Sequence, residues 1–236
     1  MWSAESPYQI ESFLKEAPAD ILCLQELTVD RPEHDHKNGP MHLAQALNRH
    51  CAYVELLPAT TDQWFLANAV ISRFPIVAQK DVLVNRSTGE GSFEDQDRAY
   101  LEVVIELGER YLTVGTTHLS YSAGFEITPR KRAEADALLS VIRERGGDYV
   151  FAGDLNATPN SYTVRNLRKI LNHVGPDLSE ATWTTKRFSH AGFQADSLEW
   201  RLDYVFASRD VTIHESRLIP TTYSDHLPIL GDLELD

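Results

Sequence analysis

The sequence predicts an α/β fold, in which buried strands alternate with amphipathic helices. Continuous apolar runs such as 149–152 are typical of buried strands. Stretches such as 129–142 repeat apolar residues at helical spacing along one face. With 236 residues, the chain is long enough to bury a sizeable core. Because no linker, internal repeat or low-complexity tract interrupts it, we expect one domain over residues 1–236.

Composition indicates an ordinary globular protein, with 42% hydrophobic and 24% charged residues. A net charge of −13 gives no general attraction to nucleic acid or to an anionic membrane, so any phosphate binding must be local or mediated by a metal. Cys23 and Cys51 lie inside apolar runs and are expected to be buried thiols. No apolar run is long enough to span a bilayer and no signal pattern opens the chain, so a cytoplasmic protein is expected.

The predicted elements follow from apolar periodicity and from helix start signals. Helices are expected at 6–17 and 40–48, after Thr128-Pro129, and after Thr158-Pro159. Strands are expected at 21–26, 51–57, 66–71, 76–84, 99–107, 110–117, 149–152, 198–206 and 211–219, with a final strand to the C-terminus. We expect the strand at 211–219 to pair with the strand at 198–206.

The stretch Gly153-Asp154-Leu155-Asn156 follows a predicted buried strand. If the strand continues through it, the side chains of Asp154 and Asn156 point the same way at the strand's carboxyl end, where ligands of α/β proteins bind. A turn followed by a helix cap would explain the same residues without any function.

Further polar residues are placed at predicted strand ends or inside apolar strands. A buried carboxylate such as Glu26 is costly unless it is paired or bound to a cation, whereas a lone histidine is usually structural. The set is Glu26, His118, Asp154, Asn156, Asp203, Asp225 and His226. Carboxylates, an amide and histidines together suit Mg²⁺ binding and acid–base chemistry on a phosphate ester. No serine, cysteine or lysine has a nucleophile context, so water is the expected attacking group.

Substrate-binding candidates are Asn68, Arg98, Trp183, Lys186 and Arg187. Asn68 interrupts an apolar strand, so it either bonds backbone in the core or faces a polar cleft. Arg98 ends a long glycine-rich polar loop, and long loops often bind ligands. Aromatic and cationic residues alternate from 183 to 188, as in phosphate and base binders, although a surface loop with a tucked tryptophan explains them equally well.

The loop 28–40 carries His34, Asp35 and His36. A solvated loop is favoured there over a metal site.

Six short motifs resemble those of the endonuclease/exonuclease/phosphatase superfamily, which has the DNase I-like fold. They occur in the family's order and cover almost the whole chain. They are LQE at 24–26, NAVISRFPI at 68–76, THL at 117–119, GDLNATP at 153–159, RLDYVF at 201–206 and SDHLPI at 224–229. The resemblance implies a four-layer sandwich, with two packed mixed β-sheets flanked by helices. His118 is more similar to the DNase I, sphingomyelinase and phosphatase branches than to the apurinic endonucleases.

The resemblance also implies roles for the polar residues. Glu26 would be the main Mg²⁺ ligand, with Asp225 helping to hold the metal; Mn²⁺ is the alternative ion. Asp154 and Asn156 would orient or activate the water. His226, held by Asp203, would polarise the phosphoryl oxygen or act as a base. His118 would bind the phosphate or assist the leaving group.

One departure from the family pattern concerns the N-terminus. Members normally begin with a strand that carries an asparagine at the metal or phosphate. We expect this first strand to be missing here. The alternative to a cytoplasmic location is therefore secretion, with an N-terminal segment removed. We expect a monomeric Mg²⁺-dependent phosphodiesterase acting on a phosphoester substrate that could be nucleic acid. Alternatives are a phosphomonoesterase of a phosphorylated sugar, inositol or lipid headgroup, and an inactive binding protein.

Overall fold

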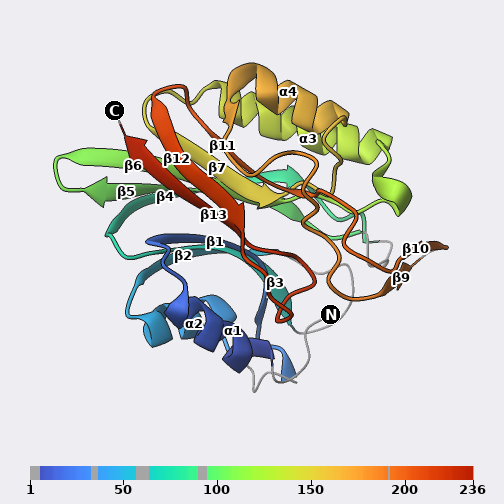
Figure 1. The fold of residues 1–236 in the computed structure, drawn as a ribbon, viewed down its shortest axis with the longest axis horizontal. Coiled ribbons are helices and arrows are strands. Elements are labelled where there is room, and N and C mark those ends of the chain that lie inside the picture. The colour runs from blue at the N-terminus through green and yellow to red at the C-terminus, as the bar shows by residue number, and fades with distance from the viewer. Residues whose placement is uncertain (1–5, 33–36, 57–63, 90–94, 191, 236) are drawn as a thin grey trace. The chain divides into compact units, whose positions relative to one another are not determined.

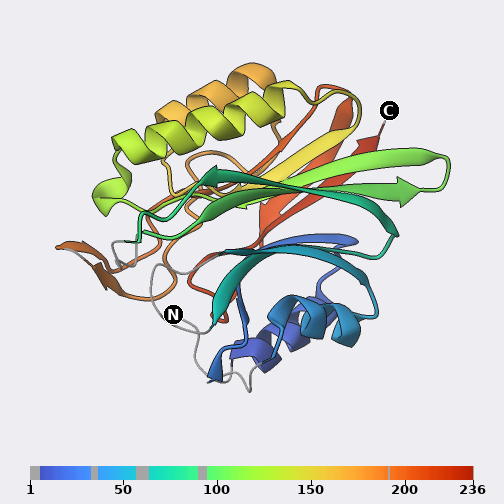
Figure 2. The same ribbon diagram turned by 180° about the vertical axis from the view of Figure 1, so that it is seen from behind.

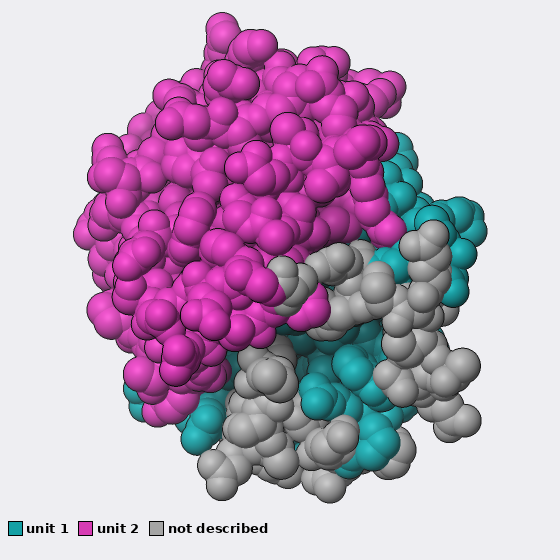
Figure 3. Space-filling model, turned by 90° about the vertical axis from the view of Figure 1, so that its right-hand side faces the viewer, with its two compact units in different colours: residues 1–118 teal, residues 119–236 magenta. Residues whose placement is uncertain are grey.

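A computed structural model describes residues 6–32, 37–56, 64–89, 95–190 and 192–235 of the chain. The chain divides into two compact units, Met1–His118 and Leu119–Asp236, which Figure 3 colours separately. The single domain over residues 1–236 therefore stays a prediction. His34, Asp35 and His36 lie outside the described residues, so their predicted solvated loop is not tested.

The first unit begins with helices packed on a three-stranded antiparallel sheet of order β1-β3-β2. Its elements are α1 (Ser6–Glu16), β1 (Ile21–Val29), α2 (Gly39–Leu47), β2 (His50–Leu56) and β3 (Phe65–Ser72). Helix α2 contacts all three strands and α1 contacts α2, so one face of the sheet is covered by helices (Figures 1 and 2). An apolar cluster that includes Leu14, Leu22, Leu43 and Ile71 fills the space between them.

Three further strands complete the described part of this unit. They are β4 (Ile76–Asn85), β5 (Arg98–Leu107) and β6 (Arg110–His118), paired antiparallel in the order β4-β5-β6. Strand β5 contacts β2 and β3, and β6 contacts β1 and β3, so these strands pack face to face with the first sheet. Most of β5 is buried, as expected for a strand covered on both faces.

Both cysteines lie in the first sheet, Cys23 in β1 and Cys51 in β2, and neither forms a disulfide. Burial raises the pKa of the Cys23 thiol to about 12 and that of the Cys51 thiol to about 11. Both cysteines are half-buried, so the expectation of buried thiols is confirmed only in part, and the raised pKa values keep both thiols protonated at neutral pH.

The second unit combines two adjacent helices with short antiparallel sheets. Its elements are η2 (Ala123–Phe125), α3 (Pro129–Arg143), β7 (Tyr149–Asp154), α4 (Tyr162–Ile170), β8 (Asn172–His173), β9 (Phe188–His190), β10 (Phe193–Ala195), β11 (Asp203–Ala207), β12 (Val211–Leu218) and β13 (Ile229–Leu235). Strand β11 pairs with β7 on one side and β8 on the other. Helices α3 and α4 lie side by side in both ribbon views (Figures 1 and 2).

Two sequence predictions about this unit are wrong. The strand at 211–219 does not pair with the strand at 198–206, because β7 and β8 already occupy both edges of β11 and β12 pairs with β13 instead. Thr158-Pro159 does not open the next helix. Ser161 caps α4 and accepts a hydrogen bond from the backbone of Val164, so the helix begins at Tyr162.

Candidate active site

Asp154 and Asp203 face each other across two paired strands of the second unit. Asp154 ends β7, Asp203 begins β11, and the two residues are directly opposite in the antiparallel register. Two carboxylates in this position repel each other. Asp154 is also buried, which makes its negative charge expensive unless a cation or hydrogen-bond donors accompany it. The pairing of β7 with β11 therefore brings two negative charges together, and a positive group between them would stabilise both.

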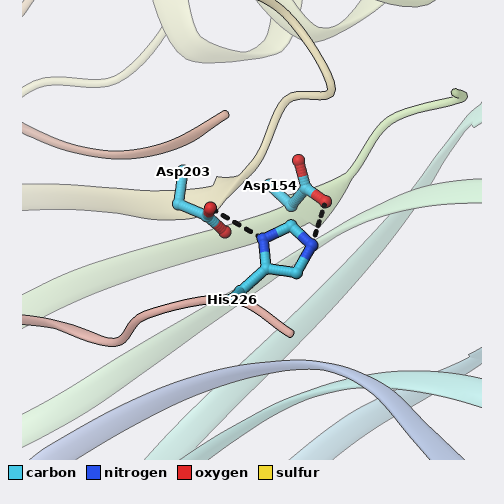
Figure 4. A group of neighbouring side chains, drawn as sticks. All are labelled: Asp154, Asp203 and His226. Carbon is cyan, nitrogen blue, oxygen red and sulfur yellow. Dashed lines mark hydrogen bonds and ion pairs between the residues drawn. The ribbon is translucent and has the colours of Figure 1, made fainter. Parts of the chain in front are cut away.

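The imidazole of His226 lies between the two carboxylates, as Figure 4 shows. Its Nδ1 donates to Asp203 Oδ2 at 2.8 Å, and its Nε2 lies 3.8 Å from Asp154 Oδ2. Burial alone would lower the pKa of His226. The negative charges of Asp203, Asp154 and Asp225 outweigh burial and hold this pKa well above its ordinary value. At neutral pH the ring is therefore an imidazolium, oriented by Asp203.

A tight turn follows β7 and sets the position of Asn156. The backbone N–H of Asn156 donates to Asp154 Oδ1 at 2.7 Å, and its side-chain Nδ2 donates to the carbonyl of Leu119 at 2.9 Å. Asn156 has a φ of 45°, a left-handed conformation that asparagine tolerates better than most residues. Because β7 ends at Asp154, strand alternation does not reach Asn156, and that sequence argument is wrong.

Asp225 is held by the neighbouring segment 182–185. The indole N–H of Trp183 donates to Asp225 Oδ2 at 3.2 Å, and the backbone N–H of Thr185 donates to the Asp225 carbonyl at 2.9 Å. Burial raises the pKa of the Asp225 carboxyl, but opposing effects, which include the His226 charge and the Trp183 bond, leave that pKa lowered. Asp225 is therefore a carboxylate at neutral pH.

In the first unit, Glu26 lies on an irregularity of β1 rather than at its end. The register between β1 and β3 shifts between Leu24 and Leu27, and Glu26 has a φ of 58°. A bulge of this kind turns a side chain away from its usual face of the sheet, and the Glu26 side chain keeps 40% of its surface exposed. The prediction that a strand ends at Glu26 is wrong, because the strand continues to Val29.

His118 is buried at the end of β6 and contacts two charged side chains. Its Nδ1 lies 3.2 Å from Arg98 Nη1 and 3.7 Å from Glu26 Oε1. A guanidinium can only donate, so the bond from Arg98 requires an unprotonated Nδ1. A neutral imidazole then carries its proton on Nε2, which can donate to a ligand oxygen. Arg98 is therefore well placed to select the tautomer of His118.

The remaining substrate-binding candidates differ in their exposure. Asn68 is fully buried in β3, where Nδ2 donates to the carbonyl of Ala99 at 3.3 Å. Trp183 is buried as well, and its ring packs against Phe125. Lys186 and Arg187 are exposed, and Arg187 forms an ion pair with Asp196 at 2.8 Å. That these residues and Arg98 contact the substrate stays a prediction.

Ligand atoms of Asp154, Asp203 and His226 all lie within 4.8 Å of one another, an arrangement that could hold a metal ion. Carboxylate oxygens suit hard divalent cations such as Mg²⁺ and Mn²⁺. A protonated His226 is not a ligand, so within this group only the carboxylates of Asp154 and Asp203 could bind a metal. Carboxylates, which Glu26 and Asp225 also carry, are the ligand type that suits a hard divalent cation.

Lys131 is a site residue that the sequence analysis did not identify. It lies in the basic run Arg130-Lys131-Arg132 at the start of α3, but its side chain is buried and its Nζ donates to the carbonyl of Asn156 at 2.6 Å. The sequence could have indicated that Lys131 is buried, because Lys131 shares the helical spacing of Ala135, Leu138 and Ile142 on the buried face of α3.

The sequence of this chain matches the Endonuclease/Exonuclease/phosphatase family over residues 3–226. The chain belongs to this family. Members of the endonuclease/exonuclease/phosphatase family are typically hydrolases that act on phosphoester bonds. No curated protein matches the chain.

Solved structures of the endonuclease/exonuclease/phosphatase family share the fold. A family member from Beutenbergia cavernae is 21% identical with a TM-score of 0.75, and the match covers 98% of this chain and 66% of that one. The human Nocturnin catalytic domain with bound sulfate is 19% identical with a TM-score of 0.68, covering 100% and 88%. A mannosyl-6-phosphatase from Bacteroides thetaiotaomicron is 14% identical with a TM-score of 0.65, covering 98% and 91%.

These matches confirm the α/β, DNase I-like fold that the motifs predict. Within the described residues, no helix is long and apolar enough to cross a membrane.

Proposed function

We propose that this protein is a divalent-metal-dependent phosphoesterase that hydrolyses a phosphodiester by direct attack of water. The observation that carries the proposal is the His226 imidazolium, which is oriented by Asp203 and directed at Asp154. A fixed cationic donor beside a buried carboxylate is suited to a reaction that builds negative charge on phosphoryl oxygens.

In the proposed reaction, Asp154 orients the attacking water and accepts its proton. One carboxylate oxygen of Asp154 is occupied by the Asn156 N–H, and the other faces His226. The 3.8 Å between Asp154 Oδ2 and His226 Nε2 exceeds a hydrogen bond. The Nε2–H group of His226 is therefore available to a phosphoryl oxygen, where its charge stabilises the transition state. Asn156 contacts the phosphate beside it.

Two further roles belong to residues of the first unit, Glu26 and His118. Glu26 is the main metal ligand, in keeping with its exposed carboxylate on the bulge of β1. Within the second unit, Asp225 has a supporting metal-binding role, in keeping with its charge at neutral pH. A bound Mg²⁺ or Mn²⁺ would supply Lewis-acid stabilisation of phosphoryl charge. His118 donates from Nε2 to the phosphate or to the leaving-group oxygen, as its bond from Arg98 favours.

A phosphomonoester is the second candidate substrate. One solved structure with this fold is a mannosyl-6-phosphatase, so the fold accommodates monoesterases. The exposed cations Lys186 and Arg187 would suit either a diester or a monoester, and the net charge of −13 does not favour long nucleic acid. An inactive binding protein is less well supported, because Asp154, Asp203 and His226 form an ordered charge network.

Hydrolysis of bis-p-nitrophenyl phosphate and p-nitrophenyl phosphate, measured side by side, tests the proposal. We expect turnover of the diester with Mg²⁺ or Mn²⁺ and loss of turnover with EDTA. A preference for the monoester would support the second candidate. Absence of turnover of both substrates by the folded protein would contradict the proposed function.

Two substitutions link that activity to the site. We expect Asp154→Ala and His226→Ala each to abolish turnover while the protein remains folded, as circular dichroism can verify. His214→Ala is a matched control, because His214 forms a similar pair with Glu234 at 2.7 Å on the exposed face of β12 and β13. Near-normal rates in either site variant would contradict the mechanism.

A further inference from the structure

The ammonium group of Lys131 is buried beside the turn that carries Asn156. Lys131 lies in the first turn of α3, where its backbone N–H is capped by Thr128 Oγ1 at 3.2 Å. Only 4% of Lys131 is exposed. Its Nζ donates to the Asn156 carbonyl at 2.6 Å and to Ser122 Oγ at 3.0 Å. The cap at Thr128 fixes where α3 begins, and the start of α3 fixes where the Lys131 ammonium lies.

Acidic groups around Lys131 compensate for part of the cost of burying its charge. Burial lowers the pKa of Lys131 to about 8, against the opposing charges of Glu134, Asp154 and Glu126. At neutral pH the side chain remains an ammonium. An apolar residue would fill the same position on the helix face without this desolvation cost, so packing alone does not account for a lysine here.

Polar contacts to several elements hold the turn after β7. Asn156 adopts a left-handed backbone that persists only when its surroundings hold it. Its N–H is bonded to Asp154, its side chain to the Leu119 carbonyl, and its own carbonyl to Lys131. Of these three anchors, only Lys131 belongs to a helix, so it connects the turn to a rigid element.

We infer that Lys131 is a positioning residue for the reaction, because its ammonium holds the Asn156 carbonyl and thereby aims the Asp154 carboxylate. Lys131 itself does not touch the substrate. This inference rests on the proposed function, since aiming Asp154 matters for turnover only if Asp154 takes part in the reaction. Catalysis is sensitive to such aiming, because a displacement of about 1 Å can cost about 100-fold in rate.

Kinetics of Lys131→Met give the first test. Methionine keeps an unbranched apolar side chain that ends where the ammonium of lysine begins, and it cannot donate a hydrogen bond. We expect kcat for bis-p-nitrophenyl phosphate to fall by about 100-fold while KM stays within about twofold. Lys131→Arg, which keeps the charge and donors, is expected to recover a large part of kcat. Lys169→Met on α4 is the matched control and should behave as wild type, because Lys169 is exposed and bonds the Asn166 side chain at 2.9 Å on the same helix.

Amide hydrogen exchange gives a second test that does not depend on activity. In Lys131→Met we expect faster exchange at the Asn156 N–H, which is bonded to Asp154, while the paired strands β7 and β11 exchange as in wild type. If the wild-type protein hydrolyses no phosphoester, the proposed function fails, and the exchange data still decide whether Lys131 holds the turn.

Unchanged exchange at Asn156 in folded Lys131→Met would overturn the inference, as would a wild-type kcat. A fall in kcat without rescue by Lys131→Arg would also count against it. If Lys131→Met does not fold, Ser122→Ala replaces it, since this change removes the second acceptor of Lys131. We expect Ser122→Ala to raise Asn156 exchange and to lower kcat by a few fold; wild-type values for both would overturn the inference.

Discussion

At the scale of single residues, the site is organised by charges that are costly to bury. Asp154 and Asp203 lie opposite each other on paired strands, and the imidazolium of His226 is the group that makes this arrangement tolerable. Removing one charged group therefore removes its own contact and also changes the pKa of the remaining groups. Substitutions at this network should be non-additive.

Asp203→Asn tests that coupling. The amide can still contact His226 Nδ1, but it lacks the negative charge that helps to keep the ring protonated. We expect kcat to fall by about 100-fold and the pKa of His226 to fall as well, because the charge of Asp203 helps to raise it. Steady-state kinetics measure the first effect, and an NMR pH titration of the His226 ring measures the second. An unchanged His226 pKa in Asp203→Asn would show that Asp203 acts independently of His226.

Lys131 predicts a specific pH dependence of stability. Its pKa is about 8 in the folded protein and 10.5 in the unfolded chain, so the unfolded chain binds the proton more tightly. Stability should therefore rise as the pH increases from about 8 to about 10.5, by at most about 3 kcal/mol from this residue. Urea unfolding of wild type and Lys131→Met across this range measures the difference. Parallel pH profiles would contradict the buried ammonium.

At the scale of elements, local sequence signals predict the secondary structure better than they predict strand pairing. Thr128 caps α3 as expected, and β2, β3, β5 and β6 agree with the predicted apolar runs to within a residue or two. The partner of β12 was wrong, because pairing depends on which sheet edges are already occupied. Apolar periodicity carries no information about occupied edges.

The same limit applies to the candidate site. Strand ends predicted the positions of His118 and Asp154, because an apolar run that stops at a polar residue is a local signal. The predicted strand at 198–206 placed Asp203 in its interior, whereas β11 begins at Asp203. The bulge at Glu26 and the turn at Asn156 require left-handed residues other than glycine. Only tertiary contacts stabilise such conformations, so periodicity could not predict them.

Close packing between α2 and β1 leads to a prediction for Gly39. A Cβ atom at Gly39 would lie 2.7 Å from the backbone oxygen of Thr28, so one of the two elements must move. We expect Gly39→Ala to reduce the free energy of unfolding by about 1–3 kcal/mol. Gly146→Ala is the matched control, because nothing lies within 4 Å of the added atom. Equal urea midpoints for the two variants would contradict this packing.

At the scale of the whole molecule, a net charge of −13 should favour the binding of small cations over that of polyanions. A divalent ion that binds the folded protein also stabilises it, in proportion to the logarithm of its concentration. Metal binding can therefore be detected without knowing the substrate.

Mg²⁺ should raise the melting temperature of the wild-type protein. At a concentration near 100 times the dissociation constant the gain is about 2.7 kcal/mol, and EDTA should remove it. We expect a smaller gain in Glu26→Gln, because this change removes a carboxylate that we assign to the metal. Glu109→Gln, in the exposed turn between β5 and β6, is the control. An undiminished gain in Glu26→Gln would remove Glu26 from the metal site.

The two thiols of the first sheet allow the rate at which this sheet opens to be measured. Cys23 and Cys51 lie on β1 and β2, which flank β3, and their raised pKa values keep them unreactive while the sheet is closed. Timed alkylation with iodoacetamide would therefore record how often each edge of that sheet opens, with mass spectrometry separating the two positions. Sheet opening could be followed in this way in any catalytic variant, including one with no remaining turnover.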